Sequence, residues 1–380
     1  MSATREPSSP ATVLLVGPEP TMIGGMAGVM GQILNLDFDG RYRIECVPVT
    51  MSSGIGESIV RRVARHVRQL WVLRRAIRRT GAAVVHIHTC SGSSFYRSVL
   101  DMWIARWTGA RVALHVHGAA FDEFYEQAGA IARRFIESSL SRADCVIALS
   151  DGWRRKLQSM SPAARIAVVE NAIELPETVA ERRHDGPCRF LMLARMDEWK
   201  GVDDLLDACA LLRADGLVVE VALAGPPGTA GDQAVLNQKI RDRDLDGAVR
   251  YIGSRQGVEK TKLFEWADAY VQPSRHEGMP LSLLEALAYG LAVVATRVGA
   301  VPEVIDDRLH GLLVPPGDPG QLARAMRELA TDEGPREAMS RAGRDLVRRR
   351  FSLARFRRDL VSLYDSLVLA PRFVVSRIYA

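Results

Sequence analysis

The sequence has little of what several classes of protein require. Its 380 residues include five cysteines, and none of them lies at the short spacing of a zinc-binding or disulfide-forming pair. No apolar run approaches the roughly 18 residues that a membrane-spanning helix needs, and the apolar run at 13–16 is too short for the core of a signal peptide. These absences predict a cytoplasmic protein, whose contact with a membrane would be peripheral and at its inner face.

Strong charge of one sign is also missing. The chain has 50 Lys and Arg against 45 Asp and Glu, a formal net charge of +5, which permits an anionic partner without identifying it. It has neither zinc-finger spacing nor a basic tail nor interleaved basic and aromatic residues, so we expect no nucleic acid partner. Its length and its 47% content of hydrophobic residues suit two globular domains.

The stretch 271–296, VQPSRHEGMPLSLLEALAYGLAVVAT, organises the rest of the chain. Its pattern predicts a buried strand, a loop, a helix and a second strand, with Pro280 in the first turn of the helix and Gly290 at its end. In such a parallel unit the loop lies at the carboxyl end of a strand, where ligands bind. Gly278 in that loop lets backbone N–H groups approach an anion held at the helix N-terminus.

Two carboxylates belong to this stretch, Glu277 in the loop and Glu285 in the helix. A carboxylate beside an anion site is unfavourable unless it accepts hydrogen bonds from hydroxyl groups, which sugars and riboses supply. The alternative is that both are ordinary solvated residues. The segment EGMPLSLLE resembles the paired-glutamate motif of retaining nucleotide-sugar glycosyltransferases of the GT-B fold, family 4, also called glycosyl transferases group 1. This resemblance favours the hydroxyl-binding interpretation.

The resemblance extends to three more segments. ARMDEWKG is similar to the family's diphosphate-binding segment, which implies that Arg195 and Lys200 hold the diphosphate, and two cations flanking one loop suit an anion. HVHGAAFD resembles the segment in which a histidine, here His117, reaches the transferred sugar. The turn containing Gly24 and Gly25 resembles the family's glycine loop, which faces the donor phosphates and the acceptor.

The resemblance implies an α/β protein of the GT-B fold, with two Rossmann-like parallel-sheet domains facing a central cleft. The N-terminal, acceptor-side domain would cover 1–175, and the nucleotide-sugar-binding domain 186–351. The last segment, 352–380, would contain a helix that crosses back to the first domain.

The resemblance also implies a nucleoside-diphosphate sugar as donor, transfer with retention of configuration, and no metal. Glu285 would accept hydrogen bonds from the ribose. The transferred sugar would be held by Glu277 together with the backbone around four residues: Gly278, Met279, Pro280 and Leu281.

Two features of the sequence bear on a metal. His86 and His88 form a His-x-His pair in one expected strand, and His115 and His117 in another, so each pair shares one face of its strand. They could bind a metal or line the cleft; no cysteine and few carboxylates would complete a coordination shell, and the resemblance favours the cleft. The Asp-x-Asp at 242–244 lies in a charged run, KIRDRDLDG, which is typical of a solvated helix end.

The stretch 59–79, IVRRVARHVRQLWVLRRAIRR, predicts a basic amphipathic helix. The apolar residues expected on its one face are Val60, Val63, Val67, Leu70, Trp71 and Ile77. This face would pack on the domain core under a solvated arginine face, or the helix would lie on a membrane with its arginines at anionic headgroups. The two interpretations are compatible if the arginines face lipid while the valines face the core.

These expectations combine into a glycosyltransferase that acts on a saccharide or lipid-linked saccharide in exopolysaccharide or cell-surface glycan synthesis. The basic helix, without any spanning segment, suggests a polyprenyl-diphosphate-linked acceptor at an anionic membrane. Two alternatives stay open: a GT-B nucleotide-sugar epimerase or hydrolase, and a non-catalytic nucleotide-sugar-binding subunit of a polysaccharide assembly.

Overall fold

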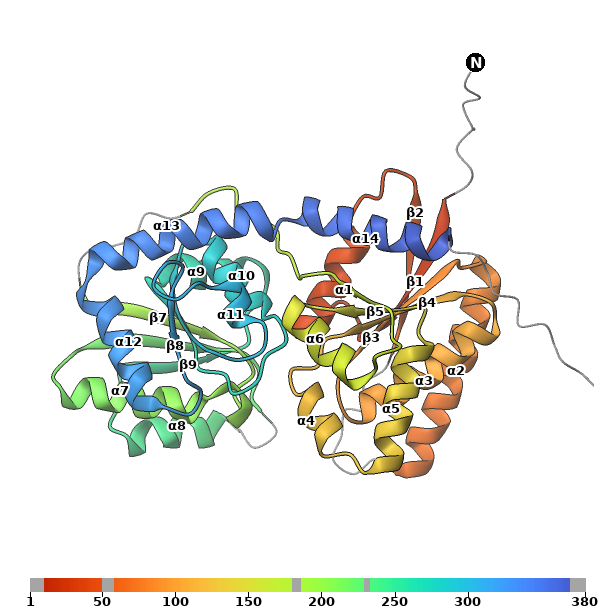
Figure 1. The fold of residues 1–380 in the computed structure, drawn as a ribbon. Coiled ribbons are helices and arrows are strands. Elements are labelled where there is room, and N and C mark those ends of the chain that lie inside the picture. Colours follow the sequence, from red (N-terminus) through yellow and green to blue (C-terminus); the bar gives the residue numbers. More distant parts are fainter. Residues whose placement is uncertain (1–9, 50–57, 180–185, 229–232, 370–380) are drawn as a thin grey trace, which may run out of the picture.

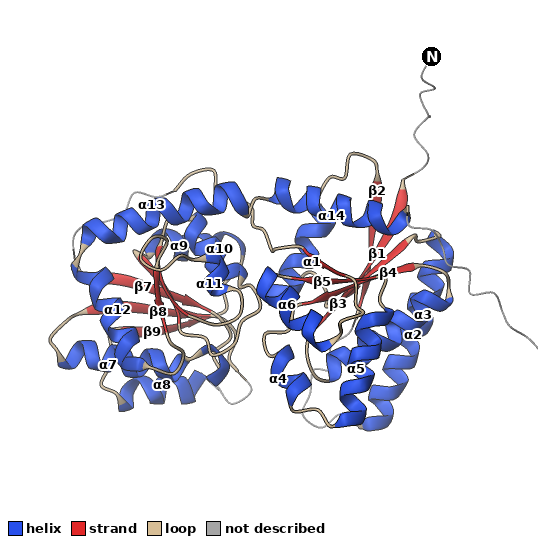
Figure 2. Ribbon diagram, in the orientation of Figure 1, coloured by secondary structure: helices blue, strands red, loops and turns tan. Residues whose placement is uncertain are grey.

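The computed structural model describes residues 10–49, 58–179, 186–228 and 233–369. The parts of the expected domains at 1–9, 50–57, 229–232 and 370–380 lie outside the described residues. Figure 1 shows two lobes side by side, joined along one edge by the helices near the end of the chain. Each lobe is a parallel β-sheet with helices on both faces (Figure 2).

The N-terminal lobe contains a six-stranded sheet in the order β2-β1-β3-β4-β5-β6, with every neighbouring pair parallel. Its strands are β1 (Ala11–Gly17), β2 (Tyr42–Pro48), β3 (Val84–Thr89), β4 (Arg111–Val116), β5 (Cys145–Ala148) and β6 (Ile166–Val168). Its helices are α1 (Gly25–Asn35), α2 (Ile59–Thr80), α3 (Ser93–Trp107), α4 (Phe121–Glu126), α5 (Ala130–Arg142) and α6 (Asp151–Met160). The central strands are buried on both faces, as continuous apolar runs in a parallel sheet require.

The C-terminal lobe contains a second six-stranded parallel sheet, in the order β12-β11-β10-β7-β8-β9. Its strands are β7 (Cys188–Leu193), β8 (Val219–Ala224), β9 (Val249–Gly253), β10 (Ala269–Gln272), β11 (Ala292–Thr296) and β12 (Leu312–Val314). Its helices are the 3₁₀ turn η1 (Glu198–Lys200), α7 (Val202–Ala214), α8 (Gln233–Asp242), α9 (Gly257–Trp266), α10 (Leu281–Ala288), α11 (Val301–Val304), α12 (Pro319–Thr331) and α13 (Glu333–Arg350).

Each sheet has a topological switch point, where successive connections leave in opposite directions. In the N-terminal sheet it lies between β1 and β3, and in the C-terminal sheet between β7 and β10. Loops at the carboxyl ends of such strand pairs are the usual ligand sites of open α/β sheets. The loops after β1, β7 and β10 carry most of the residues singled out in the sequence.

The last described helix, α14 (Leu353–Val368), lies over the N-terminal lobe, whereas α13 before it lies over the C-terminal lobe (Figure 1). Phe356, Leu360 and Tyr364 of α14 are fully buried and join the core beneath β1 and β3. Asp365 accepts a hydrogen bond of 2.5 Å from the hydroxyl of Tyr42 on β2. The N-terminal lobe is therefore completed by the end of the chain.

The unit expected at 271–296 is present as β10, α10 and β11. Pro280 lies at the N-cap position, one residue before the first turn of α10. Gly290 follows the helix with φ 68°, a conformation that favours glycine. The α/β fold with two facing parallel-sheet domains is confirmed.

The expected orientation of the basic helix is wrong for its first half. Val60, Val63, Val67 and Trp71 are between 56% and 77% exposed, so this apolar stripe faces solvent and not the core. The helix packs instead through Leu73, Ala76 and Ile77, of which only Ile77 belongs to the expected face. The sequence pattern could not distinguish two apolar stripes about 120° apart on one helix.

Two expectations about composition agree with the structure. All five cysteines are free. Among the described residues, no helix combines the length and apolar character needed to cross a bilayer.

Candidate functional site

The loops that follow β7 and β10 bring Lys200 and Glu277 together at the C-terminal switch point. The Lys200 ammonium donates a hydrogen bond of 2.6 Å to Glu277 Oε1, and the Glu277 side chain is only 9% exposed. Asp197 accepts from the backbone N–H of Lys200 at 3.1 Å and also pairs with Arg195. Arg195 itself remains 57% exposed. One loop therefore presents two cations, with Asp197 orienting both.

Glu285 lies one helical turn further into α10 and pairs with a residue that the sequence did not single out. Lys260 of α9 donates to Glu285 Oε1 at 2.6 Å. Lys260 sits in the run VEKTK, which carries no motif, so only the packing of α9 against α10 reveals this pair. Each of the two glutamates thus has its own lysine.

Two helix N-termini meet where the lobes face each other. Gly24 precedes α1 with φ 153°, and neither α1 nor α10 has a side-chain cap at its start. A Cβ at Gly28, in the first turn of α1, would lie 3.1 Å from Leu281 at the start of α10. Gly25 begins α1, and nothing lies within 4 Å of the position of a Cβ on it. Uncapped N-termini offer free N–H groups and a partial positive charge to an anion.

Gly278 and Met279 form the closest backbone contacts between the lobes. A Cβ at Gly278 would lie 2.9 Å from the backbone oxygen of His117, so any other residue would push the lobes apart. The Trp153 indole donates to the Gly278 oxygen at 3.3 Å, and the Asn171 amide donates to the Met279 oxygen at 2.8 Å. The structure therefore brings His117 to the loop that carries Glu277.

Four histidines form a stack on one face of β3 and β4. His86 contacts the Tyr364 hydroxyl at 2.8 Å and His115 at 3.1 Å, and His88 contacts His117 at 2.9 Å. Burial lowers the pKa of His86 and His117 to about 3 and that of His88 and His115 well below its ordinary value. These imidazoles are neutral at pH 7.

Three of the four histidines, His86, His88 and His115, place one ring nitrogen each within 4.8 Å of one another. Within the described parts of the chain, neither cysteine nor carboxylate joins this group. Its remaining partners are Tyr364 and His117, so the stack links α14 to the lobe junction. The Asp-x-Asp of the sequence lies elsewhere: Asp242 ends α8, which leads into β9 and therefore ends at the amino ends of the parallel strands, away from the switch-point loops.

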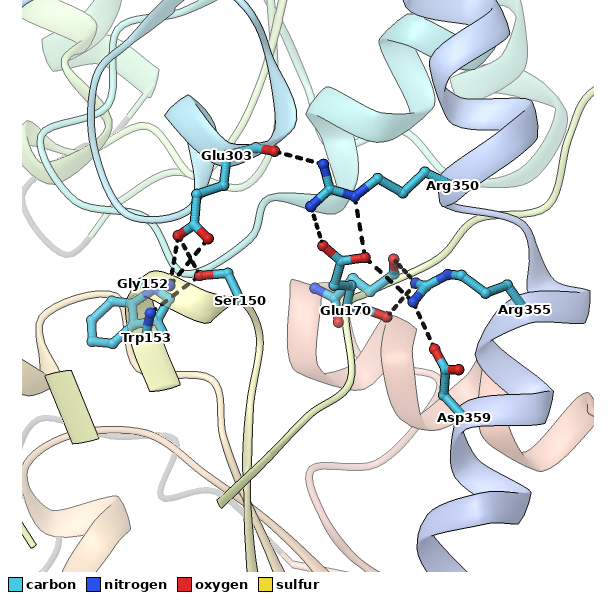
Figure 3. Close-up of polar contacts among 9 residues, drawn as sticks. Ser150, Gly152, Trp153, Glu170, Glu303, Arg350, Arg355 and Asp359 are labelled. Carbon is cyan, nitrogen blue, oxygen red and sulfur yellow. Dashed lines mark hydrogen bonds and ion pairs between the residues drawn. The ribbon is translucent and has the colours of Figure 1, made fainter. Parts of the chain in front are cut away.

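Glu303 of α11 joins the lobes (Figure 3). Its carboxylate accepts hydrogen bonds from the backbone N–H of Gly152 at 3.0 Å and from the hydroxyl of Ser150 at 2.7 Å. A residue of the C-terminal lobe thus caps the N-terminus of α6. The Glu303 backbone oxygen accepts from Arg350 at 2.8 Å, and Arg350 in turn pairs with Glu170.

Glu170 lies in the segment that connects the lobes and is held from both sides of the α13–α14 junction. Arg355 of α14 forms an ion pair with the Glu170 carboxylate at 3.3 Å and donates a hydrogen bond to the Glu170 backbone oxygen at 3.1 Å (Figure 3). Arg355 also pairs with Asp359 at 2.6 Å. The connection between the lobes is therefore fixed by charge pairs. Nothing in the sequence pattern indicated this network.

Two facing parallel-sheet lobes, with switch-point loops and helix N-termini meeting between them, define the GT-B architecture. Residues 39–172 match the family model of the glycosyl transferase 4-like domain, and residues 177–346 match that of glycosyl transferases group 1. The C-terminal lobe is thus similar to glycosyl transferases group 1, and the N-terminal lobe to the glycosyl transferase 4-like domain.

Curated relatives match the chain over part of their length. The chain is 31% identical over 235 residues to the amylovoran biosynthesis glycosyltransferase AmsK of Erwinia amylovora, a match that covers 59% of this chain and 56% of AmsK. It is 28% identical over 311 residues to the D-inositol 3-phosphate glycosyltransferase of Corynebacterium urealyticum, covering 76% and 72%. The chain spans little more than half the length of AmsK.

Solved structures share the fold over nearly the whole chain. Sucrose-phosphate synthase from Thermosynechococcus elongatus has a TM-score of 0.80 at 17% identity, covering 94% of this chain and 99% of that one. Anabaena HepE in complex with UDP-glucose has a TM-score of 0.73 at 16% identity, covering 93% and 99%. At these identities the likeness shows the fold alone.

Proposed function

We propose that this chain transfers a sugar from a nucleoside-diphosphate sugar to a saccharide acceptor, with retention of anomeric configuration. The observation that carries the proposal is the Lys200–Glu277 pair at the switch point, beside the uncapped start of α10. The matches to the two glycosyltransferase family models support it, as do the printed names of AmsK and of HepE, which was solved with UDP-glucose. The name of AmsK also supports a role in exopolysaccharide or cell-surface glycan synthesis.

The departing diphosphate gains negative charge as the sugar leaves, and fixed cations and N–H donors stabilise that charge. Lys200 and Arg195 supply the cations, and the start of α10 supplies the N–H groups. When the donor binds, the Lys200 ammonium exchanges its contact with Glu277 for a phosphate oxygen. Glu277 is then free to accept hydrogen bonds from hydroxyls of the transferred sugar.

The other groups position the donor. Glu285, held by Lys260, accepts hydrogen bonds from the ribose hydroxyls. His117 orients the sugar from the N-terminal lobe; because burial lowers the pKa of His117 to about 3, its neutral imidazole forms hydrogen bonds without carrying a proton to the reaction. The cations of the loop replace a metal in this scheme, so transfer should be insensitive to EDTA.

The test is a donor screen followed by turnover. Thermal shift with UDP-, GDP-, ADP- and dTDP-sugars identifies the donor, and ¹H NMR of the product reports the anomeric configuration. Lys200→Ala and Glu277→Ala should each lower turnover by roughly 10²–10³-fold while the protein remains folded at the assay temperature. Near-normal turnover in either variant would overturn the site. Conversion of donor without any acceptor would indicate an epimerase or hydrolase, and donor binding without turnover a binding subunit.

We further propose that the acceptor is polyprenyl-diphosphate-linked and is met at an anionic membrane surface. The exposed stripe of α2 ends at Trp71. The neighbouring helix α3 carries exposed Trp103 and Trp107, and the Arg74 guanidinium lies 4.9 Å from the Trp107 ring. Exposed tryptophans flanked by arginines are typical of surfaces that enter the lipid headgroup region. Both the arginines and the valines of α2 then face lipid.

Co-sedimentation with phosphatidylglycerol-containing liposomes tests this surface. Replacing Arg68, Arg75 and Arg78 by Gln removes about 1 kcal/mol per arginine and should weaken binding roughly 100-fold. The matched control replaces three exposed arginines of the C-terminal lobe, Arg213, Arg250 and Arg341, by Gln. Equal binding of both triple variants, or indifference of the wild type to lipid charge, would contradict the proposal.

A further inference from the structure

An exposed tryptophan stands directly beside the charge pair of the proposed transfer site. Trp199 precedes Lys200 in η1, and 47% of Trp199 is exposed. Its backbone oxygen accepts a hydrogen bond of 2.8 Å from the N–H of Arg275, in the loop after β10. The backbone that carries the indole is thus fixed to the loop after β10, at a position where burial does not explain the presence of a tryptophan. Large aromatic side chains left in water at a functional junction mark binding surfaces.

Two polar side chains complete a surface around this indole. The rings of Trp199 and His276 lie edge to face, with centroids 4.9 Å apart. His276 Nδ1 lies 3.2 Å from a carboxylate oxygen of Glu123, a residue of α4 in the opposite lobe. The Glu123 side chain is 40% exposed and that of His276 is 22% exposed, so both have atoms available to a ligand.

We infer that Trp199, His276 and Glu123 form the subsite for a neutral pyranose unit of the acceptor, an inference that rests on the proposed function. The flat C–H face of a pyranose matches an exposed indole, while its hydroxyls donate to a carboxylate and exchange hydrogen bonds with an imidazole. The donor side has its own groups, the lysine–glutamate pairs of the C-terminal lobe. His276 adjoins Glu277 in sequence, so this subsite borders the position of the transferred sugar.

The charge of the subsite indicates which sugars it takes. Glu123 repels a uronic acid or a sugar phosphate placed on the indole, because like charges at short distance disfavour each other. Since Glu123 belongs to the N-terminal lobe and the other two residues to the C-terminal lobe, the subsite is complete only in the arrangement of lobes seen here. An acceptor that bridges them favours this arrangement over any more open one.

Saturation-transfer NMR tests the subsite without requiring turnover. The full chain is mixed, with and without UDP, with methyl glycosides of glucose, galactose, mannose, fucose, rhamnose and N-acetylglucosamine, and with methyl glucuronide. At least one neutral glycoside should bind, and Trp199→Ala should weaken it by about tenfold or more, whereas Trp199→Phe should stay within about threefold. Ile131→Ala, which removes an exposed apolar side chain of α5, is the control and should bind as the wild type does.

Glu123→Gln gives a measurement, the relative affinity for charged and neutral glycosides, that would not change if Glu123 had only a structural role. It should raise the affinity for methyl glucuronide relative to methyl glucoside, because it removes the like charge. Unchanged binding in Trp199→Ala, or no neutral glycoside bound by the wild type, would overturn the inference. Saccharide binding with no UDP binding would support the subsite and overturn the proposed function. UDP binding with no saccharide binding would support the proposed function and overturn the subsite.

Discussion

The two lobes share an architecture but differ in how they bury ionisable groups. In the N-terminal lobe, His86, His88, His115 and Asp101 are at most 1% exposed, and both carboxylate oxygens of Asp101 lack a hydrogen-bond partner. In the C-terminal lobe the buried carboxylates have cationic partners. One lobe thus buries neutral forms and the other buries ion pairs, although both are six-stranded parallel sheets.

Three ion pairs illustrate the C-terminal pattern. The Asp268 carboxylate accepts two hydrogen bonds from the Arg189 guanidinium, at 2.9 and 3.0 Å. Asp204 pairs with Arg275 at 3.0 Å, and Glu277 with Lys200 at 2.6 Å. The C-terminal lobe, which carries the proposed donor loops, therefore keeps its buried groups ionised and paired, whereas the N-terminal lobe keeps its buried groups neutral. The following predictions test that contrast, in order of expected effect.

Mild acid should destabilise the N-terminal lobe selectively. Below pH 6.5 the unfolded chain protonates the four stacked histidines, His86, His88, His115 and His117, whose lowered pKa keeps them neutral in the fold, so stability falls as the pH falls. Burial raises the pKa of Asp101 to about 7, which acts in the opposite direction and cancels one proton. The net three protons correspond to about 4 kcal/mol per pH unit.

Urea unfolding at pH 7 and pH 5.5 measures the total effect. Hydrogen exchange, corrected for the intrinsic rate at each pH, assigns it to a lobe: β3 and β4 should lose protection before β7 and β10 do. Equal loss of hydrogen-exchange protection in both lobes would contradict this difference between the lobes.

Removing one carboxylate from each lobe should give opposite results. Asp268→Asn leaves Arg189 without its charge partner, and breaking a buried pair in this way costs about 3 kcal/mol of unfolding free energy. Asp101→Asn removes a carboxyl that is ionised in the unfolded chain at pH 6 but neutral in the fold, because burial raises its pKa to about 7, so the unfolding free energy should rise at pH 6 and rise further at pH 8. Urea unfolding of both variants at the two pH values is the measurement; similar losses in both would contradict the contrast.

Breaking the Glu303 contact should separate the lobes without damaging either. Glu303→Ala removes the carboxylate that caps α6, at a cost of about 1 kcal/mol, and calorimetry should resolve two transitions in place of one. Gly152→Ala should act alike, because a Cβ there would lie 2.3 Å from Glu303 Oε1. Glu328→Ala, which removes an exposed pair with Arg308 inside the C-terminal lobe, is the control. A single unchanged transition in Glu303→Ala would refute the coupling.

The smallest effect is expected at Lys260. Lys260→Ala leaves Glu285 without its partner and should weaken UDP binding by only about two- to fivefold, since partly exposed ion pairs contribute at most about 1 kcal/mol. Lys262→Ala, two residues away and exposed, should leave the dissociation constant unchanged in calorimetric titration. A loss as large as that of Lys200→Ala would mean that Lys260 contacts the nucleotide directly.

The sequence was most informative where local chemistry determines structure. Pro280, Gly278 and Gly290 belong to turns that few other residues can form, so the strand, loop and helix around Glu277 were predictable. The partners of that glutamate and of Glu285 come from distant segments, and their pairing is a result of packing. Lys260 and Glu303 were missed for this reason.

The face of α2 that meets the core was not predictable either. The helix carries two apolar stripes, and the one with Val60 and Val67 is the more regular in sequence, yet Leu73 and Ile77 are the residues that α3 and the sheet bury. Which stripe is covered depends on where the neighbouring helix lies. A pattern within one helix does not contain that information.

The crossing of α14 has a consequence for the order in which the protein can fold during synthesis. The face of the N-terminal sheet that carries the histidine stack is covered by Phe356, Leu360 and Tyr364, so it stays open until that helix has left the ribosome. Val168 ends the last N-terminal strand and Val368 ends α14, a separation of 200 positions (368 − 168). At about 5–20 residues per second, the wait is on the order of ten to forty seconds. During that time the nascent N-terminal lobe exposes an unfinished apolar face and is a natural client for a chaperone.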